Sequence, residues 1–419
     1  MHGLLSTPDH EASLNFMSNI ILLERYDGGF LEAFQRAIDW LPGAELDDRA
    51  VGLRALLKHE ATHFLDLTTT AWGGQYMFRK SRMLRIQLDG ADGLEQARDV
   101  FALESGELAL HSALLSAGAG SPSASDTIQH QLLYHEDFGV CVLLHYIKDT
   151  VCHHKVPVSM LSLLEANATA SEFLSLLQCA ESRHCHVERQ LAKDEVERRF
   201  AALLDDPARL EYSCLLHLTR VHFRELGLGD LLRLVAAVAR FSLDASSFAL
   251  AAMANRIEES FHSKRLGHAL AMELRRDASR QVIFFKTILF MYGWLQLLDN
   301  YARAEMLSLI RTEPAAAVRR MWKEAFDVET VEDHAIREFS AMSRGQLLEH
   351  PVVVVWALLV LKDVLHQVQV GCVRVEPSVN VLPLDRNRAT VVTRGGDFGG
   401  RVVGDHRKRE QFLTIRTLP

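Results

Sequence analysis

Two histidines and a glutamate near the start of the chain have the spacing of a hydrolytic metal site. They lie in the run His59-Glu60-Ala61-Thr62-His63. On a helix, residues four apart point only about 40° from each other, so the two imidazoles can bind one tetrahedral ion such as zinc. Glu60 lies on the adjoining face, where it can take a proton from water at the metal without binding the metal itself.

The surrounding residues predict that this run lies on the buried side of a long helix. Asp47 and Asp48 offer an N-cap and an acidic first turn, and helical periodicity continues to about Thr70. Two histidines and a carboxylate on an apolar face are costly to bury unless they are paired or bound to a metal. We therefore favour a metal site over the alternative, a hydrogen-bonded polar cluster.

By the residues His59-Glu60-Ala61-Thr62-His63 the chain resembles the zincin metallopeptidases. The resemblance implies that His59 and His63 are zinc ligands and that Glu60 is the catalytic base of a peptidase. The metzincin branch has a glycine at position 66 and a histidine at position 69, but Asp66 and Thr69 stand there. The resemblance then implies a third ligand from a later helix, a carboxylate, as in the His₂Glu group called gluzincins.

The stretch FALESGELALHSALL, residues 101–115, is the predicted source of that ligand. Glu104, Glu107 and His111 share one side of an otherwise apolar helix predicted over residues 94–116. Glu104 is the first choice for the third ligand and Glu107 a near-equal second. The alternative is a surface helix on which both carboxylates are solvated.

A hydrolytic site also needs a hydrogen-bond donor for the oxyanion that forms during the reaction. A second helix, predicted over residues 127–149, offers Tyr134, His135 and His145. Tyr134 and His135 are the predicted donors. The alternative is that each is an ordinary core or surface residue.

Two other functions compete with the peptidase. Three Glu-x-x-His pairs occur, at Glu60/His63, Glu181/His184 and Glu259/His262, and two such pairs can hold two irons in a helical bundle. That di-iron oxidoreductase would leave His59 without a role. The other rival is a non-catalytic helical interaction protein. Metal content separates the three, because they would bind one zinc, two irons or none.

The pattern of elements predicts a mainly α protein. A strand over residues 19–23, a helix over 30–40 and a strand over 82–88 accompany the metal-binding helix in a zincin-like catalytic region, residues 1–160. Helical periodicity then dominates a helical domain, residues 161–348. Residues 349–419 are predicted to form a core helix and a small β region, with strands near 373–382, 389–393 and 411–415.

The composition limits the partners. The net charge is −8, from 46 Lys and Arg and 54 Asp and Glu, so no basic surface for nucleic acid or anionic membranes is expected. The start of the chain has no signal-peptide pattern, and the six cysteines have no paired spacing. These features predict a cytoplasmic protein that acts on a protein or peptide substrate. The large non-catalytic remainder leaves room for a regulatory protein partner.

Overall fold

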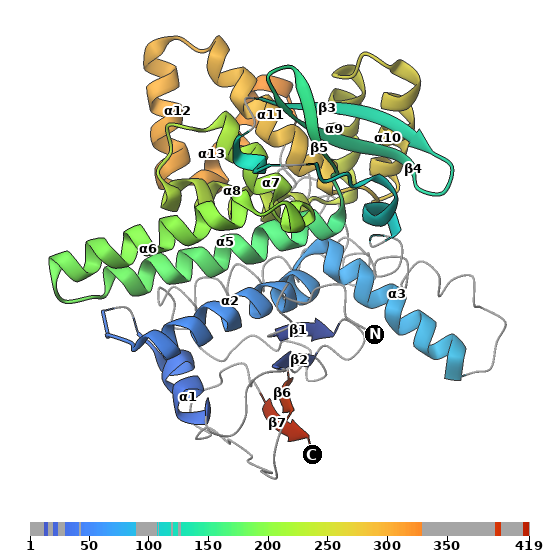
Figure 1. The fold of residues 1–419 in the computed structure, drawn as a ribbon. Helices are drawn as coiled ribbons and strands as arrows, with labels where there is room; N and C mark the ends of the chain where they lie inside the picture. Colours follow the sequence, from blue (N-terminus) through green and yellow to red (C-terminus); the bar gives the residue numbers. More distant parts are fainter. Residues whose placement is uncertain are drawn as a thin grey trace, which may run out of the picture.

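The computed structural model describes residues 12–15, 20–23, 30–41, 43–88, 107, 109–118, 120–124, 127–328, 390–394 and 414–418. Helices dominate this part of the chain (Figure 1), which confirms the mainly α class. The end of the predicted helical domain after residue 328, the core helix predicted after residue 348 and the strand near 373–382 lie outside the described residues.

The run His59–His63 lies on a helix, α2 (Asp48–Thr69), as predicted. The helix begins at Asp47, whose side chain accepts a hydrogen bond from the Ala50 backbone N–H at 2.8 Å. In Figure 1, α2 lies between α5 on one side and the strands β1 (Ala12–Asn15) and β2 (Ile20–Leu23) on the other. The short helix α1 (Leu31–Asp39) packs against its N-terminal half. Both long sides of α2 are therefore covered by protein.

A second helix, α3 (Ala71–Leu88), follows α2 almost directly, so the strand predicted over residues 82–88 is wrong. Gly73 makes this close junction feasible. A Cβ at Gly73 would lie 2.3 Å from the Asp66 carbonyl oxygen and 2.2 Å from that of Leu67. The short alternation over residues 82–88 also fits apolar positions three or four apart, so it could not distinguish strand from helix.

Residues 127–157 form an antiparallel sheet, so the helix predicted over 127–149 is also wrong. The strands are β3 (Thr127–His135), β4 (Gly139–Lys148) and β5 (Val151–Pro157). Gly139 starts β4 with φ +69°, which suits the tight β3–β4 turn. β4 is buried from Val140 to Leu144, and a continuous apolar run of this kind lacks the alternation that marks a half-exposed strand.

The central helix is α5 (Met160–Glu181), which is buried at every position from Met160 to Ala170. Ser159 caps it by accepting a hydrogen bond from the Ser162 backbone N–H at 3.1 Å. α5 packs against α2 on one side and against α7 and α8 on the other (Figure 1). Because this first half of α5 is buried on all sides, the polar residues in it, such as Glu165, are buried against other elements.

The remaining helices wrap around α5 and α8. They are α6 (His186–Asp205), α7 (Leu210–His222), α8 (Leu228–Asp244), α9 (Ser247–Glu259), α10 (Lys264–Arg275), α11 (Gln281–Leu297), α12 (Asn300–Thr312) and α13 (Pro314–Phe326). One hydrophobic core runs through the described residues from Ala12 to Val328. The division of the chain near residue 160 remains a prediction.

Two short strands near the end of the chain, β6 (Thr390–Arg394) and β7 (Thr414–Leu418), fall near strands predicted from the sequence. They extend the N-terminal sheet in the order β1-β2-β6-β7, with β6 parallel to β2. The rest of the predicted C-terminal β region lies outside the described residues.

No single helix in the described ranges combines the length and the apolar character needed to cross a membrane. Only α8 and residues 249–259 pass that test together, as a pair bent by 113°.

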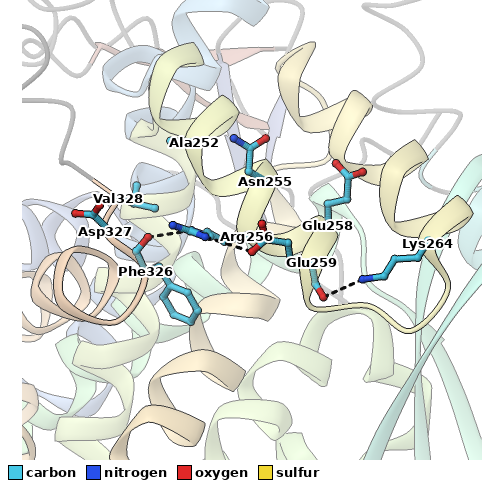
Figure 2. A pocket seen from close by; sticks show the side chains of 9 residues that line it. All are labelled: Ala252, Asn255, Arg256, Glu258, Glu259, Lys264, Phe326, Asp327 and Val328. Atoms are coloured by element: carbon cyan, nitrogen blue, oxygen red, sulfur yellow. Dashed lines mark hydrogen bonds and ion pairs between the residues drawn. The ribbon is translucent and has the colours of Figure 1, made fainter.

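An open surface pocket of about 540 Å³ lies between α9, the start of α10 and the end of α13 (Figure 2). Its charged groups bind one another: Arg256 donates to the Phe326 carbonyl oxygen at 3.0 Å and pairs with Glu259 at 3.3 Å. Glu258 accepts hydrogen bonds from His268 and Arg275. The residues of this pocket are therefore satisfied by the chain itself.

Candidate metal centre

α2 presents His59, Glu60 and His63 on its buried side. Their residue exposures are 6%, 0% and 1%, so all three are shielded from water. Apolar residues of α2 such as Leu53, Leu56 and Leu67 share this face and pack into the core. The packing of α2 therefore fixes where the two imidazoles and the carboxylate point.

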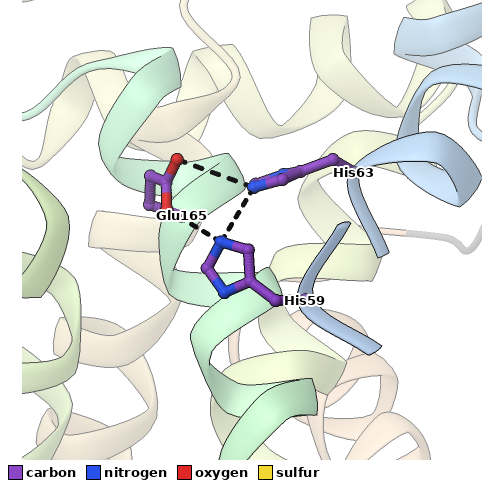
Figure 3. Close-up of side chains that lie close together, drawn as sticks. All are labelled: His59, His63 and Glu165. Carbon is purple, nitrogen blue, oxygen red and sulfur yellow. Dashed lines mark hydrogen bonds and ion pairs between the residues drawn. The ribbon is translucent and has the colours of Figure 1, made fainter. Parts of the chain in front are cut away.

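The third member of the centre is Glu165 on α5. Its carboxylate oxygens lie 3.4 Å from His59 Nε2 and 3.5 Å from His63 Nε2, and the two Nε2 atoms are 3.2 Å apart. Figure 3 shows both imidazoles pointing at the carboxylate across the α2–α5 interface. Ligands about 2.0–2.2 Å from a tetrahedral zinc are spaced about 3.3–3.5 Å apart. The three side chains thus have nearly the spacing of a zinc site.

A second carboxylate of α5 holds His59 from the other side of its ring. His59 Nδ1 lies 3.1 Å from a Glu172 carboxylate oxygen, which accepts its proton. This bond keeps a proton on Nδ1, so Nε2, which faces His63 and Glu165, is the nitrogen that a metal ion would take. Metal-binding histidines usually have such a partner, because it orients the ring and strengthens it as a ligand.

The two histidines have opposite proton affinities. Burial by itself lowers the pKa of His59, but the hydrogen bonds and charges of Glu165 and Glu172 outweigh burial and raise it well above its ordinary value. Burial, together with the charge on His59, lowers the pKa of His63 well below its ordinary value. The site therefore binds positive charge at His59 and keeps a neutral imidazole at His63, and a divalent cation would take the place of the His59 proton.

Glu60 is a buried carboxylate beside this group but not a member of it. Burial raises its pKa to about 8, and the charges of Glu165 and Glu172 add to this effect while His59 opposes it. The Leu14 backbone N–H of β1 is near enough to favour the charged form, yet neither carboxylate oxygen makes a well-formed hydrogen bond. A group of this kind can take up and release a proton near neutral pH.

Several buried polar atoms in and beside this group lack a hydrogen-bond partner within the ranges that the structure describes, and one of them, Glu165 Oε1, is an atom that could bind the ion. In the described part of the chain, no hydrogen bond reaches His63 Nδ1, Glu165 Oε1 or either oxygen of Glu60. Buried polar atoms are normally satisfied, and the exceptions need an explanation. Among the described residues, His59, His63 and Glu165 are the group of potential ligands that could hold a metal ion.

The ligands predicted on residues 101–115 are not placed beside His59 and His63 in the described structure. Glu104 lies outside the described residues, and Glu107 does not join His59 and His63. Glu107 instead interacts with the start of α5, through the Ser159 side chain and the backbone N–H groups of Met160 and Leu161. A carboxylate there stabilises the helix N-terminus. Burial raises its pKa to about 7.

The predicted donors Tyr134 and His135 lie at the end of β3, next to the turn, and not on a helix that could face the metal. Tyr134 is 65% exposed, and β3 packs on β4, α7 and α10. Asp66, the next acidic residue on α2 after Glu60, is fully buried.

Two members of this candidate centre, Glu165 and Glu172, were not predicted from the sequence. Glu165 interrupts the apolar run from Leu161 to Ala170, and Glu172 lies two turns farther along the same face of α5. An acid inside an apolar helical run must be paired, bound to a metal or neutralised, and this was the available signal.

The geometry does not supply a second half for a di-iron centre. Glu181 and His184 lie at the end of α5 with side chains 56% and 77% exposed, and Glu259 at the end of α9 is 67% exposed. Neither pair belongs to a potential metal group among the described residues. The remaining pair, Glu60/His63, has His59 as its neighbour, which a di-iron site does not use.

No family model matches this chain, and no curated protein or solved structure gives a significant match. The argument for function therefore depends on the residues of α2 and α5.

Proposed function

We propose that this chain is a zinc-dependent hydrolase that cleaves a peptide or similar amide bond, with a zincin-like region around α2. One observation supports this most strongly: α5 brings the Glu165 carboxylate within 3.5 Å of both histidines of the His59–His63 motif. His59, His63 and Glu165 would hold the ion. Zinc bound there would act as a Lewis acid that polarises a substrate carbonyl and makes water more acidic.

Glu60 would be the general base. It lies beside both ligand histidines on α2 and is not a ligand itself. Its pKa of about 8 lies close enough to neutral pH for both the charged and the protonated form to be accessible, and a divalent cation beside it would favour the charged form that accepts a proton. Glu60 can therefore accept a proton from the attacking water and return it to the leaving amine, which neither Glu165 nor Glu172 is free to do while it holds His59.

Tyr212 on α7 is the candidate donor that replaces Tyr134 and His135 in this proposal. Its ring is partly buried, and α7 packs against α5. Burial raises the pKa of Tyr212, and the nearby charges of Glu165 and Glu211 raise it further. The phenol therefore remains protonated near the metal ligands, as a donor to an oxyanion must.

The donor set also suits ferrous iron, which binds two histidines and one carboxylate in many oxygenases. Glu60 favours hydrolysis, because an extra carboxylate beside the metal is what water activation needs. The proposed peptide substrate follows from that chemistry and from the resemblance to zincins.

The test compares the wild type with Glu60→Gln against a peptide mixture, with mass spectrometry to detect cleavage. Glu60→Gln should keep its zinc and lose about 10²–10⁴-fold of the cleavage rate, because proton transfer contributes roughly that factor. Tyr212→Phe should lose a smaller factor. The matched control is Glu181→Gln, which alters an exposed carboxylate at the other end of α5 and should cleave like the wild type. Equal rates for the wild type and Glu60→Gln would overturn the proposal.

A further inference from the structure

A second buried cluster joins the two helices of the metal centre. Asp66 lies three residues beyond His63 on α2 and is fully buried. Asn167 lies two residues beyond Glu165 on α5, and its Nδ2 atom donates to both Asp66 carboxylate oxygens at 2.9 Å. The helical rise places each partner only about 3–5 Å along the axis from a metal ligand.

Arg240 on α8 completes this cluster. Its Nη1 atom donates to Asp66 Oδ1 at 2.8 Å, and its Nη2 atom donates to Thr69 Oγ1 at 3.0 Å. The guanidinium also lies 3.9 Å from Asp244 in the last turn of α8. One carboxylate of α2 is therefore bound by α5 and α8 together.

We propose that Asp66, Asn167 and Arg240, here called the Asp66 clamp, set the position of α2 relative to α5 and thereby hold His63 and Glu165 at metal-binding distance. The inference rests on the proposed metal site and assigns positioning residues to it. It also gives the helical part of the chain a role, because α8 supplies the cation of the clamp.

The chemistry of the clamp indicates this role over simple packing. Replacing a buried ion pair by well-packed apolar residues is often neutral or stabilising, so stability alone does not require it. Hydrogen bonds, unlike apolar contacts, are directional and weaken steeply outside a narrow range of distance and angle. The clamp can therefore prevent α2 from sliding along α5. A metal site needs this control, since its ligands must be held to within about 0.5 Å.

Asn167→Leu tests the clamp, because leucine has a similar volume but donates no hydrogen bond. Removing a group that binds a metal ligand directly lowers metal affinity by about 10–100-fold, and the clamp acts one contact farther away, so zinc should bind more weakly by about 10-fold. The visible absorption spectrum of the cobalt(II)-loaded protein should also change at full occupancy, because the ligand geometry changes. A general loss of stability does not produce this spectral change.

The matched control is Thr287→Val, which removes the 3.0 Å hydrogen bond between Thr287 on α11 and Trp322 on α13. This variant should lose stability while keeping the zinc affinity and the cobalt spectrum of the wild type. If Asn167→Leu does not fold, Arg240→Gln serves instead, since the Arg240 side chain is 24% exposed and lies at the outer end of the clamp.

These experiments distinguish failure of the clamp proposal from failure of the proposed enzyme activity. Wild-type zinc affinity and an unchanged cobalt spectrum in Asn167→Leu or Arg240→Gln would overturn the clamp proposal alone. If the wild type binds metal normally but shows no hydrolysis that depends on Glu60, the proposed enzyme activity alone would be overturned. A wild-type chain that binds neither zinc nor cobalt would overturn both.

Discussion

The buried charges at Arg280 and at the metal centre are surrounded in different ways. Arg280 is 1% exposed, and its Nη1 atom donates to the backbone carbonyls of Ser242, Leu243 and Ala245 at 2.7–3.2 Å. Its Nη2 atom donates to Asp277 at 2.8 Å. Only Nε lacks a partner. The protein thus satisfies this cation with the carbonyl groups at the end of α8 and one carboxylate.

At the metal centre the buried groups converge on one another, and several remain unsatisfied. The Nε2 atoms of His59 and His63 face each other at 3.2 Å, and both oxygens of Glu60 lack a well-formed hydrogen bond. Burial of this kind costs free energy that the protein's own groups do not recover. Burial alone therefore does not identify a functional site. Buried imidazoles and carboxylates that converge and are only partly satisfied by one another are better evidence for one.

The largest expected effect is the loss of folding stability when Arg280 is replaced. Arg280→Met should destabilise the fold by about 3–5 kcal/mol, because Asp277 and three carbonyl groups lose their buried partner. Zinc content should stay at the wild-type value in the fraction that folds. Urea unfolding and elemental analysis measure the two quantities. If Arg280→Met keeps its stability, or loses zinc without unfolding, Arg280 would not be the purely structural site that this comparison makes it.

A smaller effect on stability is expected at His217, a buried histidine that contributes to the fold and lies outside the candidate metal centre. Its Nε2 atom donates to the Leu204 carbonyl oxygen at 2.7 Å, its ring contacts Tyr146, and burial lowers its pKa to about 4. The folded-state pKa lies below the ordinary value of 6.5. The contribution of His217 to stability is therefore complete above pH 6.5 and is lost as the pH falls toward 4.

His217→Gln removes this titration. Between pH 6.5 and 4, its free energy of unfolding should fall by about 1–3 kcal/mol less than that of the wild type. Urea unfolding of zinc-free protein at both pH values measures the difference, and adding EDTA keeps the metal centre out of the comparison. An equal loss of stability in both proteins would show that His217 is not held neutral by the fold.

The sequence was sufficient to predict the elements that depend on residues close to one another along the chain. The N-cap at Asp47 and the long helix that carries His59 and His63 follow from residue types within a few positions of one another. The predominance of helices follows from the same periodicity. These features depend on neighbours along the chain, so one sequence is enough to predict them.

The position of Glu165 beside His59 and His63 depends on tertiary packing and was not predicted. Residues 101–115 carry the nearest paired carboxylates after α2, but α5, which contains Glu165, is the helix that packs on α2. The intervening β3–β5 sheet added to the difficulty, because the buried run of β4 has no alternation to separate it from a helix. Glu165 could have been noticed only as an acid in an apolar run, which says that it has a partner but not which one.

Zinc content is the most direct test of the central claim, that His59, His63 and Glu165 form one metal site. Wild type, Glu165→Gln and Glu107→Gln are purified without a metal-affinity tag, loaded with zinc, dialysed against buffer and measured by elemental analysis. The wild type and Glu107→Gln should retain about one zinc per chain, whereas Glu165→Gln should lose most of it, because one of three protein ligands is gone. Full zinc retention by Glu165→Gln, or loss of zinc in Glu107→Gln alone, would contradict the site described here.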